Sequence, residues 1–247
     1  MKTINRVLAG MVIAAAILAA CNSRSSLPKL FVGIDASFSP FVTIGAGKNE
    51  FTGLDVELMK AIASKAGYRA VFGTESRNML LPGMVMCRYD AAVSAFPINR
   101  PPEEQIQFSD PYLTEDLVLV VQKSNITINS PAGLAGATVG VENGSPAASE
   151  VAKIPGAQLV DFNSTDQAFR NLIFGNVEAV VTSRTLALEY ANIPANHLKI
   201  VGDKLGSESY AIAVCQAKPE LLAKINAGLA AMKNDGTLNK LIKKWIK

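Results

Sequence analysis

Two stretches of this 247-residue chain combine residue types that suit recognition of a small ligand. The first, residues 90–112 (DAAVSAFPINRPPEEQIQFSDPY), runs from a short apolar segment into turns that are broken by Pro97 and by Pro101-Pro102. In an open α/β sheet, ligands bind just beyond the C-terminal end of such a strand. This stretch therefore predicts a ligand-binding rim. The alternative is an ordinary strand, loop and helix of the core.

The second stretch is Glu142 to Pro146 (ENGSP), which follows a short apolar run. Proline is favoured at the first position of a helix, so Gly144 and Ser145 stand where main-chain N–H groups without partners can hold an anion. A capped helix without any ligand explains the same residues equally well.

The composition is that of a folded protein with a sizeable core, because 49% of the residues are hydrophobic and 18% are charged. The net charge of +3 is spread along the chain, with no basic stripe interleaved with aromatic residues, so we expect no nucleic-acid partner. One histidine, His197, and three cysteines do not suit a zinc site, and the sequence implies no metal or organic cofactor.

The N-terminus has the pattern of an export signal. Lys2 and Arg6 precede an apolar run, Val7 to Ala20, that is too short for a typical membrane span. The run ends at Cys21, as in the lipobox of bacterial lipoproteins, so we expect residues 1–20 to be a signal peptide and Cys21 to carry lipid, palmitate included. Residues 21–28 then form a tether. This predicts an exported protein, anchored by its lipid at the cell envelope; the alternative is a plain signal peptide with an incidental cysteine.

Two cysteines remain beyond Cys21, namely Cys87 and Cys215. An exported protein with two cysteines favours a disulfide, and the alternative is a pair of buried thiols that behave as small hydrophobic residues.

The rest of the chain alternates strands with helices, which predicts an α/β architecture with largely parallel sheets. The continuous apolar run Leu117 to Val121 is typical of a strand buried on both faces. Asp55 is expected to cap a helix that Gly67 ends. Strands are expected near 30–34, 68–73, 91–96, 117–121, 138–141, 159–162, 179–181, 198–201 and 211–215, and helices near 55–66, 79–88, 165–174, 184–192, 219–234 and 238–247.

In its motifs the chain resembles the type II periplasmic solute-binding proteins of family 3, whose best-known members bind polar amino acids for ABC importers. The resemblance covers residues 29–247 in the family's order and spacing. It is carried by DASFSPF at 35–41, TGLDVEL at 52–58, FSDPY at 108–112, LKIVGD at 198–203, AAMKNDGTL at 230–238 and KKW at 243–245.

The resemblance implies an α/β fold of two lobes, with mixed sheets flanked by helices and two crossover hinges. Lobe 1 would comprise residues 29–111 and 211–247, and lobe 2 residues 116–205, with hinges near 112–115 and 206–210. The implied function is closure of the lobes on a small polar solute, without catalysis. The implied partners are that solute and an ABC permease with its ATPase, and the protein is expected to be a monomer.

The resemblance implies ligand-binding residues at the positions of this chain that match the family's motifs. Asp35 keeps the character of an acidic acceptor, Phe38 that of an aromatic wall, and Arg77 stands at the second wall. The main chain of Ser94, Ala95 and Phe96 corresponds to the acceptors of a ligand ammonium group. In lobe 2, Gly144 and Ser145 correspond to the helix start that completes a carboxylate site.

At other positions the chain departs from the family. Pro97 replaces a hydroxyl residue, and Pro102 replaces the arginine that grips the ligand carboxylate, which leaves Arg100 as the nearest substitute. The acid that pairs with the ammonium aligns with Ser183, beside Arg184.

Two hypotheses for the ligand follow. An amino acid is bound differently, with Arg100 taking the carboxylate and Asp35 or Glu142 the ammonium. Alternatively, a small carboxylate or other anion is bound by Arg77, Arg100 and Arg184.

Two other functions stay open on the same fold. A few relatives are dehydratases of cyclohexadienyl acids, for which Asp35 and Glu142 are acids of the required type. A sensor that presents its ligand to a membrane receptor is the other alternative.

Overall fold

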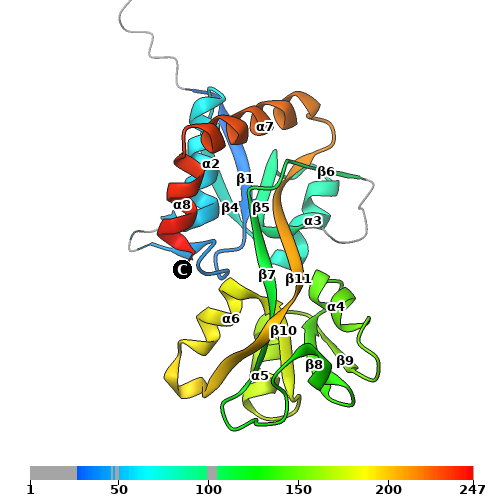
Figure 1. Cartoon of the computed structure of the whole chain (residues 1–247). Helices are drawn as coiled ribbons and strands as arrows, with labels where there is room; N and C mark the ends of the chain where they lie inside the picture. Colours follow the sequence, from blue (N-terminus) through cyan, green and yellow to red (C-terminus); the bar gives the residue numbers. More distant parts are fainter. Residues whose placement is uncertain (1–26, 46, 48–49, 99–104, 247) are drawn as a thin grey trace, which may run out of the picture.

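The computed structural model describes residues 27–45, 47, 50–98 and 105–246. Residues 1–20, Cys21, most of the tether, Arg100 and Pro102 lie outside the described residues. Figure 1 shows two lobes, one above the other, with two long strands running from one into the other. We call the upper one lobe 1 and the lower one lobe 2, and the residue boundaries expected from the sequence stay a prediction. Within the described part, none of the helices has the length and apolar composition that crossing a membrane requires.

Lobe 1 is built on β1 (Lys29–Ile34), which pairs in parallel with both β4 (Arg69–Thr74) and β5 (Ala91–Pro97). The strand β11 (Leu198–Cys215) runs antiparallel to β5 and also pairs with the short β6 (Ile106–Phe108). A separate hairpin joins β2 (Thr43–Ile44) to β3 (Phe51–Thr52). The helices of this lobe are α2 (Leu54–Lys65), α3 (Arg77–Val85), α7 (Pro219–Asn234) and α8 (Thr237–Trp245).

Lobe 2 contains β8 (Thr138–Glu142), which pairs in parallel with β9 (Gln158–Phe162) and with β10 (Ala179–Ser183). The strand β10 is antiparallel to β7 (Leu113–Gln122). Its helices are α4 (Pro146–Val151), α5 (Thr165–Ile173) and α6 (Arg184–Ala191), with 3-10 turns at η1 (Pro131–Leu134) and η2 (Pro194–Asn196).

The strand β7 is buried on both faces, as its apolar run predicts. Leu117, Leu119 and Val121 pack in the core on the α4 side, whereas Val118 and Val120 pack on the side of α5 and α6. This prediction is confirmed, because alternate side chains of one strand supply two separate cores.

The strands β7 and β11 form an antiparallel ribbon between the lobes, visible in green and orange in Figure 1. Residues 113–117 pair with residues 206–210, so the two segments expected as crossovers run side by side. The sequence predicted separate strands at 198–201 and 211–215. The structure instead has one strand of 18 residues with a register shift between Val201 and Gly206. All described strands but β2 and β3 therefore belong to one mixed sheet in the order β4-β1-β5-β11-β7-β10-β8-β9, with β6 paired to β11 off this path. The mixed sheet confirms the fold that the resemblance implies, whereas the largely parallel sheets expected from the alternation of strands and helices are not found.

Asp55 does not cap α2. The N-cap residue is Gly53, and its φ of 123° favours glycine because an added Cβ would lie 2.3 Å from the Phe41 carbonyl oxygen. Asp55 is fully buried one residue into the helix. Its Oδ2 accepts the N–H of Ala95 at 2.9 Å and its Oδ1 accepts the Tyr112 hydroxyl at 2.7 Å. The carboxylate thus ties α2 to the end of β5 and to the start of the ribbon.

Cys87 and Cys215 form a disulfide in the structure. The bond joins the turn after α3 to the end of β11, across 128 residues of sequence. It therefore connects the two segments of chain that make up lobe 1.

Candidate ligand-binding site

A cavity of about 1450 Å³ lies between the lobes. Lobe 1 contributes the turn after β1, the length of α3 and the end of β5, and lobe 2 contributes the ends of β8 and β9 and the helices α5 and α6. The residues that matter most for its charge and shape are Asp35, Phe38, Arg77, Glu142, Thr165 and Glu189. A second cavity of about 40 Å³ opens from it, because Phe38, Arg77, Glu142 and Thr165 line both.

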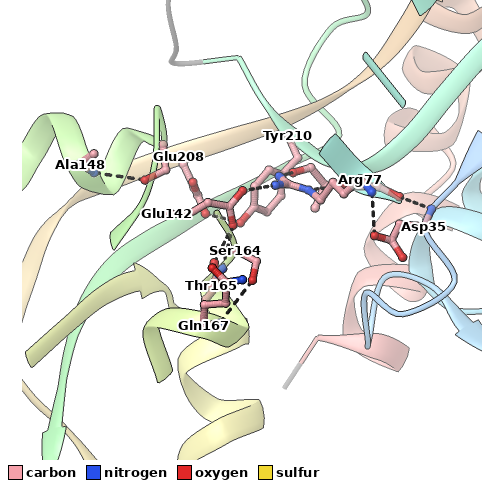
Figure 2. A network of polar contacts seen from close by, with 12 residues as sticks. Asp35, Arg77, Glu142, Ala148, Ser164, Thr165, Gln167, Glu208 and Tyr210 are labelled. Carbon is pink, nitrogen blue, oxygen red and sulfur yellow. Dashed lines mark hydrogen bonds and ion pairs between the residues drawn. The ribbon is translucent and has the colours of Figure 1, made fainter. Parts of the chain in front are cut away.

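The side chain of Arg77 crosses the space between the lobes, as Figure 2 shows. Its Nε donates to the Ser94 carbonyl oxygen at 3.0 Å and its Nη2 to the Ala95 carbonyl oxygen at 3.0 Å. Its Nη1 lies 2.5 Å from Glu142 Oε1 in lobe 2, and its guanidinium carbon lies 4.9 Å from the centre of the Phe38 ring. The predicted second wall is therefore a cation that stacks on the first wall and bridges the lobes.

The strand end that carries these carbonyls has an unusual backbone. Ala95 has a φ of 45°, in the left-handed region that residues other than glycine rarely adopt. Its N–H donates to Asp55 and its carbonyl accepts from Arg77, so contacts on both sides hold the conformation. Phe96 follows and faces the larger cavity.

Asp35 serves the helix that carries Arg77. Its Oδ2 accepts the main-chain N–H of Arg77 at 2.9 Å, and its Oδ1 accepts the N–H and the hydroxyl of Ser37. The N–H of Asp35 in turn donates to Ser94 Oγ at 2.8 Å. The residue lines the larger cavity, but its carboxylate also caps α3.

Glu142 is held rigidly on the lobe 2 side. Its Oε2 accepts both the N–H and the hydroxyl of Thr165, the first residue of α5, at 3.2 Å and 2.8 Å. The partial positive charge of a helix start favours a carboxylate there. Both of its oxygens therefore have partners, one in each lobe.

Three other residues predicted in lobe 2, Gly144, Ser145 and Ser183, line the smaller cavity. Ser145 caps α4 by accepting the N–H of Ala148 at 3.2 Å, and Gly144 beside it has a φ of 66°. Ser183 is fully buried at the end of β10 and also lines this cavity. Arg184 is exposed and lines neither cavity, so the structure does not bring it together with Arg77.

Sequence reasoning missed Glu208, which lies on the ribbon and lines the smaller cavity. The side chain is only 7% exposed, and its Oε1 accepts the Tyr210 hydroxyl. Directly opposite on β7 stands Glu115, equally buried, whose Oε1 accepts the Thr185 hydroxyl. The sequence does place one acidic residue in each expected hinge segment, and this pattern could have pointed to the two acids.

Burial has the largest effect on the pKa of each of these two acids. It raises the pKa of Glu208 to about 7, and the Tyr210 hydrogen bond and the charge of Arg77 offset this only in part. Burial also raises the pKa of Glu115. A low dielectric disfavours a carboxylate unless a cation or enough donors accompany it.

No group of three or more histidine, cysteine, aspartate or glutamate residues suited to a metal ion occurs in the part of the chain that the structure describes. In chemical terms, the site is a polar cleft with a bridging arginine, an aromatic wall and buried acids.

The model for bacterial extracellular solute-binding proteins, family 3, matches residues 30–247. ABC transporter arginine-binding protein 1 of Escherichia coli (strain K12) is 29% identical over 241 residues, which cover 95% of this chain and 98% of that protein. A solved ancestral arginine-binding protein bound to arginine is 36% identical with a TM-score of 0.77, over 89% of this chain and 98% of the other. The ancestral amino acid-binding protein AncCDT-1, described as a precursor of cyclohexadienyl dehydratase, is 30% identical with a TM-score of 0.76, over 89% and 96%.

Proposed function

This chain belongs to the bacterial extracellular solute-binding proteins of family 3, and we therefore propose that it is the substrate-binding protein of an ABC importer. It captures a small polar solute, an amino acid or a related small carboxylate, by closing its two lobes. The protein makes and breaks no covalent bond in this role.

The observation that carries the proposal is the cavity lined from both lobes and bridged by Arg77 and Glu142. A solute between the lobes contacts both, so its binding free energy favours the closed arrangement over the open one. The ribbon of β7 and β11 connects the lobes and is the natural position of the hinge.

The structure favours an amino acid over a simple anion. The charged residues that line the smaller cavity in the described part of the chain are Arg77, Glu142 and Glu208, and Glu115 stands opposite Glu208 on β7. Arg77 already pairs with Glu142. Arg184 lies away from both cavities, and Arg100 is outside the described residues. A ligand with a cationic group would balance the buried acids, whereas a dianion would add to their repulsion.

We further propose export and attachment of the mature protein to the envelope through a lipid on Cys21. Mass spectrometry of the protein from membranes tests this attachment. A Cys21→Ser variant is expected to be released from the membrane fraction, and retention of that variant would contradict the anchor.

A melting-temperature screen tests the binding function. The mature chain is heated with each common L-amino acid and with a matched set of dicarboxylates. A true ligand at a hundredfold excess over its Kd stabilises the folded state by about 2.7 kcal/mol, which gives a clear shift. Absence of a shift with every compound, together with no change in small-angle scattering, would contradict the proposed function.

The likeness to AncCDT-1 makes dehydration of cyclohexadienyl acids the second candidate function. Incubation with prephenate and with arogenate tests it directly, and we expect no turnover. Ligand-dependent capture of the importer's permease, rather than of a membrane receptor, separates transport from sensing.

A further inference from the structure

We propose that Glu115 and Glu208 act as a proton-sharing carboxyl pair in the ribbon between the lobes, and that this pair makes closure of the lobes dependent on pH. The inference rests on lobe closure as the proposed function, but it does not depend on which solute is bound. It gives the chain a means by which the pH of its surroundings sets the balance between open and closed protein.

The two acids occupy facing positions in the ribbon. Glu115 on β7 and Glu208 on β11 are directly opposite each other in the antiparallel register, so their side chains lie on the same face. Each residue is only 7% exposed. Like charges at directly opposite positions destabilise two paired strands, and burial strengthens the repulsion because water screens it less. A single proton held between the two acids removes that repulsion.

The hydrogen-bond donors around the pair are too few for two ionised carboxylates. Glu115 Oε1 accepts the Thr185 hydroxyl, whereas Glu115 Oε2 is buried and has no hydrogen-bond partner among the described residues. The Tyr210 hydroxyl donates to Glu208 Oε1. It also offsets part of the rise that burial causes in the pKa of Glu115, so this one hydroxyl lies beside both acids. A protonated carboxyl group would supply the missing donor.

The charges that act on Glu208 do not neutralise the pair. Burial raises the pKa of Glu208 to about 7, the charges of Glu115 and Glu142 add to this rise, and Tyr210 and Arg77 offset it only in part. Arg77 is engaged by Glu142 and by two carbonyl oxygens of lobe 1. Two carboxylates therefore face each other without a cation of their own in the described part of the chain.

The charged residues on neighbouring elements are engaged elsewhere or exposed. The helices α4 and α6 both pack against the ribbon. The residues concerned are Glu150 on α4, paired with Lys153; Asp116 on β7, paired with Lys204; and, on α6, the exposed Arg184 and Glu189, which accepts from Ser39. The titration of the pair thus depends on the groups already named.

The position of Glu208 connects its charge to the movement of the lobes. The residue lines the smaller cavity, to which lobe 1 contributes Phe38 and Arg77 and lobe 2 contributes Glu142 and Ser145. Separation of the lobes would withdraw one set of these walls and admit water, which stabilises an ionised carboxylate. The closed arrangement therefore favours the protonated acid and the open arrangement the ionised one, so closure takes up a proton from the solvent.

The sign of the pH dependence follows from this difference. An exposed Glu208 in the open arrangement would titrate near the ordinary pKa of 4.5, whereas the buried residue has a pKa of about 7. The contribution of the pair to closure is therefore fully present below pH 4.5 and is lost as the pH rises through about 7. We expect the unliganded chain to be closed at acidic pH and more open at alkaline pH.

Carbon-13 NMR tests whether the two acids share a proton. The full mature chain, with Cys21→Ser so that no lipid is attached, is labelled at the side-chain carboxyl carbon of glutamate and titrated without solute. We expect Glu115 and Glu208 to titrate in two coupled steps. Glu115→Gln should lower the midpoint of Glu208 by about one pH unit or more, and Glu208→Gln should do the same for Glu115. Independent titrations that neither substitution shifts would overturn the inference.

Small-angle X-ray scattering tests the link to closure, over the pH range in which circular dichroism shows an unchanged fold. The radius of gyration of the unliganded wild type should increase between pH 5 and pH 8. Glu208→Gln should keep its low-pH value throughout, because an amide does not titrate. Glu220→Gln, exposed on α7, is the matched control and should follow the wild type. A constant radius in the wild type, or an equal increase in Glu208→Gln, would show that the pair does not control closure.

Both measurements omit the solute, so their failure is distinct from failure of the proposed function. A solute that raises the melting temperature of a chain whose scattering ignores pH leaves the proposed function standing and removes the inference. If a variant does not fold, the wild-type titration decides alone. Single-step titration of every glutamate at its ordinary pKa would then contradict the shared proton.

Discussion

Arg77 Nη1 lies 2.5 Å from Glu142 Oε1, and this ion pair connects the first residue of α3 in lobe 1 to the last residue of β8 in lobe 2. Each side chain is about one-fifth exposed, so solvent screens the pair only partly. The guanidinium uses two further donors on carbonyl oxygens of lobe 1, while Glu142 uses its second oxygen on the start of α5. Both partners are therefore held in place on their own lobes, and the pair forms only when the lobes are close.

Removal of the arginine should open the protein. We expect Arg77→Ala to increase the radius of gyration of the unliganded chain, because the described contact between charged groups of the two lobes is lost. Small-angle X-ray scattering measures this change. Arg88→Ala is the control, since Arg88 pairs with Glu75 within lobe 1. Equal scattering from the wild type and Arg77→Ala would show that the pair does not hold the lobes together.

The raised pKa of Glu208, on the ribbon, predicts that the free energy of unfolding depends on pH. Burial raises the pKa of Glu208 from 4.5 in the unfolded chain to about 7 in the folded one, so folding favours the protonated form. The associated stability is fully present below pH 4.5 and is lost as the pH rises through about 7. The Glu208→Gln variant removes this loss. We expect its free energy of unfolding at pH 8 to exceed that of the wild type by on the order of 3 kcal/mol.

Chemical denaturation at pH 5 and pH 8 checks this prediction. Asp55 has a pKa raised to about 7 by burial and adds a loss of the same sign, but it is present in both proteins and cancels in the comparison. The exposed Glu220→Gln is the control and should follow the wild type. Parallel pH curves for Glu208→Gln and the wild type would contradict the assignment.

The buried carboxylate of Asp55 should be coupled to Tyr112. Replacement by Asn leaves either the Tyr112 hydroxyl or the Ala95 N–H without its acceptor, and we expect a loss of about 1–3 kcal/mol in the free energy of unfolding. Tyr112→Phe should cost less, because it removes a donor without leaving Ala95 unpaired. In urea unfolding, the double variant should be more stable than the sum of the single changes predicts. Additive losses would mean that the hydrogen bond contributes little.

The disulfide should contribute to stability by restricting the unfolded chain. It closes a loop of 128 residues, and the loss of such a bond costs about 2–5 kcal/mol. The Cys87→Ser, Cys215→Ser double variant should therefore melt several degrees below the oxidised wild type. The reduced wild type should match the variant. A variant that melts with the oxidised protein would show that the bond adds no stability.

The order of strands and helices could be read from the sequence, because apolar spacing and turn residues act over a few neighbours. The motifs spread over residues 29–247 identified the family for the same reason, since each is a short local segment. The ends of the helices and strands were predicted less accurately than their order. Asp55 looked like a helix cap because its type suits one, but its side chain serves Ala95 and Tyr112, which are distant in sequence.

The contents of the cleft were decided by the tertiary structure. Arg77 and Glu142 are 65 residues apart, and only the stacking of the lobes brings them together. Ser183 by itself suggested a missing acid, but the fold places Glu208 at the same cavity from a strand 25 residues further along. The pairing of Glu208 with Glu115 depends on the register of two long strands, which shifts between Val201 and Gly206. Local sequence patterns do not encode such a register, because it is set by the packing of both lobes at once.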